Sequence, residues 1–505
     1  MEYFDNIILG FQIILTPVNL LFCFIGVTLG TLVGVLPGIG PLGAIAMLFP
    51  ATFKIEASTG IIMLAGIWYG AMYGGSTTSI LVNIPGESAS VITTLDGYQM
   101  ARQGRAGPAL GIAAIGSFIA GTLSVLGLMF VAQPLAKVAL QFGPPEYFSL
   151  MCIGIIIISY LGRGSTLKAL MMALVGLIIG NVGLDLVTGL PRFTFGIEEL
   201  TDGIKLAPAA MGLFGISEVF LNLEKTIKTD VYKTKYGHLW PSLKDWADSI
   251  GAILRGTVIG FGLGNLPGVG PVTSSFVSYA VEKKVSKQPE RFGKGAIQGV
   301  AGPESANNAA TGGNLVPLIA LGIPSTPLLG MLYAALLVHG VQPGPLFIKN
   351  YPDIFWGLVA SMYVGNLLLL VLNLPLIAIW VKVLKIPYHI LFPLILLFCL
   401  IGVYSLDNSS FDLYILLIFG FLGYLIRKFG FEPAPLLLAL VLTPQLEAHL
   451  RRSLAISDGS FAIFFTRPIS AVLLGFAVFI LLSNFLPYFR RGRKRHEAFL
   501  DEEDG

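Results

Sequence analysis

A short segment that occurs twice places the tightest constraint on this chain. Residues Gly30–Pro41 read GTLVGVLPGIGP, and residues Gly260–Pro271, at an offset of 230, read GFGLGNLPGVGP. The shared Pro-Gly-x-Gly-Pro core cannot continue a helix, because each proline lacks an N–H donor and each glycine frees the backbone. Both copies lie between apolar runs. Inside a membrane, broken helix is tolerated only where it is buried in protein or lines a cavity, so we expect both breaks at a binding site.

Composition points to a membrane protein. The 505 residues are 54% hydrophobic and 12% charged, and the charged share is about half the roughly 25% of soluble domains. Apolar runs recur along the chain, and 60 glycines and 30 prolines suit transmembrane helices with interruptions. We therefore predict an all-α polytopic membrane protein with about 10–12 transmembrane helices plus re-entrant or broken helices.

The chain divides into two similar parts around a hydrophilic linker. We expect a first transmembrane repeat over 1–223, a linker over 224–248, a second repeat over 249–489 and a tail over 490–505. The first repeat carries expected helix breaks at 30–41 and 74–88, and the second at 260–271 and 302–327. The later pair also correspond, because GGS followed by IPG in the first half resembles GGN followed by IPS in the second.

The distribution of Lys and Arg predicts the orientation. With the basic tail placed in the cytoplasm, 23 of the 32 Lys and Arg residues fall on the cytoplasmic side, as the positive-inside rule requires. The turn Lys54–Ser58 then lies outside, while Glu282–Lys294, which follows the matching motif, lies inside. We therefore expect two inverted-topology repeats with both termini in the cytoplasm.

The breaks offer two kinds of ligand group. The N-terminal ends of half-helices carry partial positive charge suited to a carboxylate, and freed carbonyls with Ser, Thr and Asn oxygens suit sodium. We predict substrate contacts from Pro37, Gly38, Gly40, Ser76, Thr77, Asn83, Pro267, Gly268, Gly270, Asn307, Asn308, Ser325 and Thr326. We predict contacts to a coupling ion from Thr78, Ser79, Asn307, Asn308, Thr311, Asn314, Glu87 and Glu304.

Glu87 and Glu304 are the acidic residues inside these stretches. A carboxylate in the middle of a membrane costs about 2.5–3.5 kcal/mol on insertion scales, so it needs a partner or a task. Two interpretations stay open: each residue coordinates an ion or proton, or each caps a half-helix near the interface.

The sequence lacks the motifs of soluble enzymes. It has no Gly-Lys-Ser/Thr phosphate loop and no HExxH, and Gly260-x-Gly262-x-Gly264 lacks the strand–helix context of a dinucleotide fold. The three cysteines have no metal-ligand spacing. We expect no catalytic residues, no cofactor, no metal beyond a possible sodium ion, and no nucleic-acid partner.

Four stretches together resemble the large membrane subunit, the TctA type, of the tripartite tricarboxylate transporter family. They are the two LPG-[IV]-GP segments, YGGSTTSILVNIPGES and GPESANNAATGGNLVPLIALGIPSTP. The resemblance covers nearly the whole chain. It implies import of a di- or tricarboxylate such as citrate, or another organic acid, across the bacterial inner membrane.

The resemblance also implies two partners, a periplasmic solute-binding protein and a small membrane subunit. It implies a secondary transporter driven by cations or protons, with the two LPG motifs, Gly74–Ser79 and Asn307–Asn314 forming the transport site. By analogy with related carriers we expect an elevator-like movement. Because neutral oxygen donors outnumber acids at the breaks, sodium is favoured over protons as the coupling ion. The alternatives are a proton-coupled carrier, a channel, or an intramembrane enzyme, for which no convincing catalytic set exists.

Overall fold

A computed structural model describes residues 2–36, 40–161, 166–185, 187–224, 239–266, 268–383 and 388–482. In this part of the chain the protein is helical apart from one two-stranded hairpin. Four helices are long and apolar enough to cross a membrane: Pro17–Val35, Ala106–Ala139, Pro352–Asn373 and Ser410–Lys428. Several further apolar helices are shorter. The expectation of an all-α membrane protein is confirmed, while the number of spans stays a prediction.

The first part of the chain contains helices α1 to α6 with two short 3₁₀ turns. Their bounds are α1 Glu2–Ile14, α2 Pro17–Val35, α3 Gly40–Leu48, η1 Phe49–Thr52, α4 Ala57–Val82, η2 Ser88–Val91, α5 Thr93–Arg102 and α6 Ala106–Ala139. A middle group follows: α7 Pro144–Leu161, α8 Thr166–Gly180, β1 Gly183–Leu184, β2 Pro191–Arg192, η3 Glu198–Asp202, α9 Leu206–Ala210, the π-helical η4 Met211–Ile216 and α10 Ser217–Glu224.

The second part of the chain begins at α11. Its elements are α11 Leu243–Gly264, α12 Pro271–Val285, η5 Pro289–Arg291, α13 Gln298–Leu321, α14 Pro327–Val338, α15 Phe347–Asn350, α16 Pro352–Asn373 and α17 Ile377–Val383. The last group consists of α18 Tyr388–Asp407, α19 Ser410–Lys428, α20 Ala434–Ile456 and α21 Ile463–Thr466. Residues 225–238 of the expected linker and the expected tail 490–505 lie outside the described residues.

Helices α2 and α4 pack through glycines at every fourth position. A Cβ on Gly30 would overlap the carbonyl group of Ile67, and Gly26 and Gly34 meet α4 one turn earlier and one turn later. Glycines spaced in this way let two helix backbones touch, which is a common contact between helices in membranes. Because the contacts advance together along both helices, α2 and α4 run parallel.

Helices α11 and α13 pack by the same contacts. Gly256, Gly260 and Gly264 lie 230 residues after the glycines of α2, and they approach the backbone of Gly302, Ala306 and Ala310. The turns that end α4 and α13 also correspond, because Asn83 and Gly322 both adopt the left-handed conformation, with φ of 60° and 71°. The two helix pairs therefore share one packing pattern.

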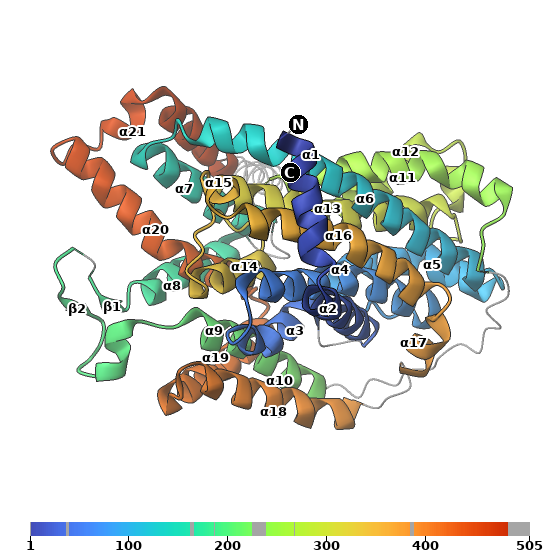
Figure 1. The fold of residues 1–505 in the computed structure, drawn as a ribbon, viewed down its shortest axis with the longest axis horizontal. Coiled ribbons are helices and arrows are strands. Elements are labelled where there is room, and N and C mark those ends of the chain that lie inside the picture. Colours follow the sequence, from blue (N-terminus) through green and yellow to red (C-terminus); the bar gives the residue numbers. More distant parts are fainter. Residues whose placement is uncertain are drawn as a thin grey trace, which may run out of the picture.

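The two halves interlock at the centre of the molecule. Helix α6 of the first half lies along α13, and α16 of the second half lies along α4 (Figure 1). Asn366 of α16 joins them, since it accepts from Tyr73 Oη at 2.5 Å and donates to the carbonyl of Phe118 at 2.9 Å. The core of the protein therefore lies between segments distant in sequence.

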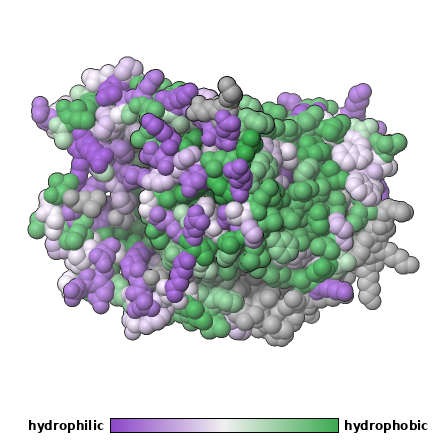
Figure 2. Space-filling model, in the orientation of Figure 1, coloured by the Kyte–Doolittle hydropathy of each residue, from purple (hydrophilic) through white to green (hydrophobic). Residues whose placement is uncertain are grey.

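An outer group of helices lies beside this centre. Helices α9, η4, α10, α18 and α19 pack together along one side, and α7, α8 and α20 form another group, from which the β1–β2 hairpin projects (Figure 1). Figure 2 shows a broad hydrophobic face over the right half of the same view, where α2, α6 and α16 lie. Exposed Leu21, Phe24, Phe130 and Leu367 from these helices agree with a surface that faces lipid.

Two of the expected breaks are placed differently by the structure. Residues 74–79 belong to α4 and residues 302–321 to α13, so the Gly-Ser-Thr and Asn-rich stretches are helical rather than irregular. Both helices are almost completely buried, and a helix satisfies its own backbone hydrogen bonds where no water is present. The prediction of breaks is wrong for these residues, and the chain leaves the helix only after Val82 and after Leu321.

Candidate functional site

A cavity of about 780 Å³ lies where the breaks of the two halves meet. One wall consists of the start of α3, the loop after α4, and residues 268–273 and 325–328. The facing wall consists of Phe214, Glu218 and residues between Arg427 and Leu438. Because the duplicated motifs of both halves reach it, this cavity is the candidate binding site of the protein.

Three helix N-termini point their first turns at this cavity. Helix α3 begins at Gly40, α12 begins at Pro271 directly after Gly270, and α14 begins at Pro327 after Thr326. Thr326 caps α14, since its Oγ1 accepts from the N–H of Leu329 at 3.3 Å. Helix N-termini carry partial positive charge and unpaired N–H groups, so this geometry suits an anionic ligand.

Several predicted substrate residues line the cavity, and three lie outside the described residues. Those at the cavity are Gly40, Gly268, Gly270, Ser325 and Thr326, and they are joined there by Glu87, a residue predicted to contact the coupling ion. Those outside the described residues are Pro37, Gly38 and Pro267. Gly40 and Gly268 have φ of 66° and 84°, and the N–H of Gly268 donates to the carbonyl of Ser325 at 2.9 Å, so the second motif is bound to the loop before α14.

Other predicted residues stabilise the breaks from behind. Asn314 Nδ2 donates to the carbonyls of Gly264 and Val269 at 2.8 and 2.9 Å, on either side of the second motif. Thr78 Oγ1 donates to the carbonyl of Val35 at 2.7 Å, at the end of α2, and Ser79 Oγ donates to the carbonyl of Ser90. These contacts satisfy carbonyl groups that a helix end leaves unpaired. Ion binding by these residues stays a prediction.

Glu304 is the centre of a buried polar cluster apart from the cavity lining. Its carboxylate accepts from Ser76 Oγ at 2.5 Å, from Asn307 Nδ2 at 3.2 Å and from the hydroxyl of Thr93. Glu304 is completely buried in α13, so the interpretation of a cap at the membrane interface is wrong for this residue. The cluster links α13 to α4 and α5, and the surrounding donors stabilise a buried carboxylate.

The remaining predicted residues lie around this cluster or at its end. Asn308 Nδ2 donates to Ser117 Oγ at 2.8 Å, and Thr311 Oγ1 donates to the carbonyl of Asn308 at 2.6 Å. Thr77 lines, with Ser76, a gap of only about 10 Å³. Asn83 is exposed and ends α4. Ser76, Asn307 and Asn308 therefore lie next to one another in the structure, but they do not line the cavity.

Glu87 caps the 3₁₀ turn η2 and also borders the cavity. Its Oε2 accepts from the N–H of Ala89 at 2.6 Å, and Ser90 closes a capping box from the other side. Its Oε1 is buried and has no hydrogen-bond partner in the structure. Glu87 therefore caps a 3₁₀ turn, its position relative to the membrane interface stays a prediction, and one carboxylate oxygen is left for another ligand.

Sequence reasoning missed the residues of the facing wall. Arg427, Glu218 and Phe214 are not among the predicted site residues, and neither is Thr93, which binds Glu304. One signal lay in the sequence, because Glu218 is an acidic residue that follows the apolar run Met211–Ile216 after a single serine. The π-helical turn itself, a feature often found at functional sites, follows only from the structure.

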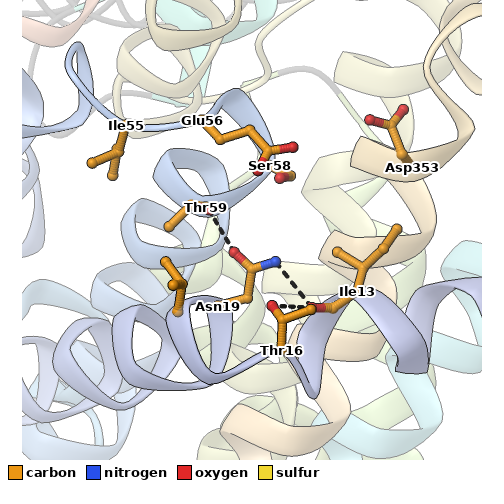
Figure 3. Close-up of a pocket in the computed structure, with 9 residues that line it drawn as sticks. Ile13, Thr16, Asn19, Ile55, Glu56, Ser58, Thr59 and Asp353 are labelled. Atoms are coloured by element: carbon orange, nitrogen blue, oxygen red, sulfur yellow. Dashed lines mark hydrogen bonds between the residues drawn. The ribbon is translucent and has the colours of Figure 1, made fainter.

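A second cavity, of about 520 Å³, lies at the turn between α1 and α2 (Figure 3). Asn19 is fixed there by a bond from Thr59 Oγ1 at 2.5 Å and by its own bond to the carbonyl of Ile13 at 2.9 Å. Glu56 and Asp353 also line this cavity. It holds none of the predicted site residues, so it is separate from the candidate site.

The fold and the cavity define a class of protein. Buried helices that end in the interior, with a cavity between their ends and an apolar outer surface, are features of a multi-pass membrane transport protein. The chain belongs to the tripartite tricarboxylate transporter TctA family, which residues 20–438 match. The resemblance seen in the sequence is therefore confirmed, and transport rather than catalysis is consistent with this family.

Two related proteins come from Agrobacterium vitis. One is 52% identical over 503 residues that cover all of both chains, and it is described as an uncharacterized 52.8 kDa protein in the TAR-I ttuC' 3' region. The other is 51% identical over 241 residues, 48% of this chain and 99% of its own, and it is described as an uncharacterized protein in the TAR-II ttuC' 3' region. No solved structure matches the chain.

Proposed function

We propose that this protein is the large permease subunit of a secondary carrier that imports a di- or tricarboxylate or another organic acid across the bacterial inner membrane. It works with a small membrane subunit and a periplasmic solute-binding protein, and both of its termini lie in the cytoplasm. The observation that carries this proposal is the cavity at which both copies of the duplicated motif and three helix N-termini meet. An anionic ligand at these ends is stabilised without any strongly basic pocket.

The proposal includes two inverted repeats that move as one body. Support comes from the matching contacts of α2 with α4 and of α11 with α13, and from the interlocking of α6 and α16. These helices form a mobile core, and the outer group that contains η4, α10 and α19 forms the static scaffold. The cavity lies between the two groups, where an elevator-like movement would carry its contents across the membrane.

Sodium is the proposed coupling ion. A multiply charged acid that enters against the membrane potential costs about 2.3 kcal/mol per charge per 100 mV, so cations must accompany it. Neutral oxygens at the breaks, among them Ser325 and Thr326, supply the ligands that sodium prefers. Proton coupling is the second candidate, since the buried carboxylate of Glu304 and the unpartnered Oε1 of Glu87 could each carry a proton.

Reconstitution of the three proteins in vesicles tests the function. Citrate and succinate serve as probes, with an imposed sodium gradient or an imposed pH gradient as the driving force. We expect saturable uptake that depends on the binding protein and follows sodium. Asn308→Ala should raise the sodium concentration for half-maximal uptake more than it changes apparent substrate affinity. Uptake driven by a pH gradient alone would establish proton coupling instead, and uptake without saturation or any coupling ion would indicate a channel.

A further inference from the structure

One cation and three carboxylates line the described part of the cavity. Among the described residues that line it, Arg427 is the one Lys or Arg, whereas Glu87, Glu218 and Glu432 are acidic. The carboxylates would repel an organic acid that enters this space unless a cation balances its negative charge. The guanidinium of Arg427 is therefore the side chain that decides how a carboxylate is held there.

Arg427 is already engaged by a carboxylate of the protein. Its Nη1 donates to Glu218 Oε2, and its Cζ lies 5.5 Å from the centre of the Phe214 ring. The two side chains are 24% and 26% exposed, so the ion pair is half-open to the cavity rather than sealed in the protein. Because both side chains line the cavity, a carboxylate that enters it can reach the guanidinium and exchange with Glu218.

The backbone beneath this ion pair is rigidly packed. A Cβ on Gly423 of α19 would come within 2.8 Å of the carbonyl oxygen of Leu213, and one on Gly212 would meet α19 as closely. Helix α19 therefore lies directly on the π-helical turn η4 that carries Phe214. This packing fixes the end of α19, so that Arg427 lines the same cavity as the N-termini of α3, α12 and α14.

We infer that Arg427 binds a carboxylate group of the transported acid, and that Glu218 occupies the guanidinium until that group replaces it. The inference rests on the proposed function and names a subsite within it. A substrate carboxylate presents the same pair of oxygens as Glu218, and the planar guanidinium fork suits both. The exchange replaces one carboxylate with another on the guanidinium, and the helix N-termini that line the same cavity would stabilise a second carboxyl group of the acid.

Lys428 provides a matched control on the same helix. It is adjacent to Arg427, but its Nζ donates to Glu224 Oε1 at 2.8 Å and to Tyr424 Oη at 2.6 Å, and it does not line the cavity. A general loss of positive charge at the end of α19 would affect both residues equally. A carboxylate subsite requires Arg427 alone.

The inference is tested by direct binding measurements. Citrate and succinate are added to the purified complex of this protein with its small membrane subunit. Arg427→Gln should weaken binding by about tenfold or more, as expected for charged hydrogen bonds, while Lys428→Gln leaves it unchanged. Arg427→Lys should recover only part of the loss, because an ammonium lacks the fork geometry. Glu218→Gln should tighten binding by roughly threefold or more, because it removes the competing charge.

Two outcomes separate failure of the subsite from failure of the function. If the wild-type complex binds citrate or succinate and neither Arg427→Gln nor Glu218→Gln changes the affinity, the subsite is overturned while the proposed function stands. If the wild-type complex binds neither acid, the proposed import of di- and tricarboxylates fails and the subsite with it. Weaker binding by Glu218→Gln would show that the ion pair is structural. This variant keeps the test decisive even if Arg427→Gln fails to fold.

Discussion

Gly268 shows how one residue can fix the geometry of the cavity. Its φ of 84° lies in the region that favours glycine, and its N–H is bound to the carbonyl of Ser325. Any side chain at this position strains the backbone by about 1–3 kcal/mol or moves it away from the loop before α14. The residue type at this point of the motif is therefore set by backbone conformation.

Gly268→Val should lower citrate uptake in the reconstituted system to about a tenth or less, with normal amounts of protein in the membrane, because the second motif loses its conformation. Gly262→Val is the control. Gly262 belongs to the same sequence motif but lies in α11, and a Cβ there meets no atom within 4 Å. Equal uptake by the two variants would contradict a conformational role for Gly268.

Asp185 closes the turn of the β1–β2 hairpin. Its carboxylate accepts from the N–H groups of Thr188 and Val187 at 2.9 and 2.8 Å and pairs with Arg451 at 2.5 Å. The backbone N–H groups of Thr188 and Val187, with Arg451, hold the pKa of Asp185 well below its usual range. A lowered pKa in the folded state adds stability above the unfolded pKa of about 3.9, and this stability is lost as the pH falls.

Asp185→Asn should therefore lower the melting temperature of the protein at pH 7, and the difference from the wild type should shrink as the pH falls below about 4. Asp202→Asn, an exposed acid in the same connection, should have no effect at either pH. Thermal unfolding in detergent across this pH range provides the measurement. A difference that does not vary with pH would show that Asp185 acts through its shape and not its charge.

At the scale of the helix, close backbone contact explains the glycine spacing of α2 and α11. Both helices place a glycine against a carbonyl of the neighbouring helix at every fourth residue, and both run parallel to that neighbour. In a membrane the hydrophobic effect does not drive helices together, and the close packing that small residues allow takes its place. The glycine spacing therefore allows the two helices of each pair to pack, whereas the Pro-Gly motif that follows contributes to the cavity.

Gly260→Ala should destabilise the protein by about 1–3 kcal/mol, because its Cβ would overlap the carbonyl group of Ala306. Gly262→Ala, two residues further along α11, should stabilise the helix slightly, since its Cβ meets open space and alanine favours helix over glycine. Melting temperatures of the two variants in detergent provide the comparison. A loss of stability at Gly262 equal to that at Gly260 would place the effect in the helix itself, not in its contact with α13.

At the scale of the whole molecule, the arrangement of the two halves explains why neither can form the site alone. Helix α6 covers α13 of the other half, and α16 covers α4, while the cavity takes segments from both. Such interlocking fixes the relation between the halves through contacts between helices. The distribution of Lys and Arg predicts that the turns Lys54–Ser58 and Glu282–Lys294, which follow the two LPG motifs, lie on opposite sides of the membrane.

Single cysteines test this topology. Ala57 begins α4 and Ser286 follows α12, so Ala57→Cys should react with an impermeant thiol reagent from outside the cell and Ser286→Cys only from inside. The background replaces Cys23, Cys152 and Cys399 by alanine, and this cysteine-free protein without either new cysteine is the control for labelling. Reaction of both positions from the same side would contradict the inverted arrangement.

The sequence by itself determined the class, the family and the location of the LPG motifs. Apolar runs identify membrane helices, because lipid admits no unpaired backbone, and the duplicated Pro-Gly segments mark breaks, because proline and glycine cannot continue a helix. The sequence also supplied the residues at the motif ends that line the cavity, among them Gly40, Gly270 and Thr326.

Only the tertiary structure decided which polar residues meet. The Gly-Ser-Thr stretch of α4 and the Asn-rich stretch of α13 have the composition of loops, yet burial makes helix the favourable state, and their side chains turn to Glu304 and to the backbone of the breaks. Arg427 and Glu218 are 209 residues apart, and nothing local in the sequence couples them. Their contact arises because α19 packs on η4 and α10, and such long-range packing depends on the shapes of surfaces that the linear order of residues does not display.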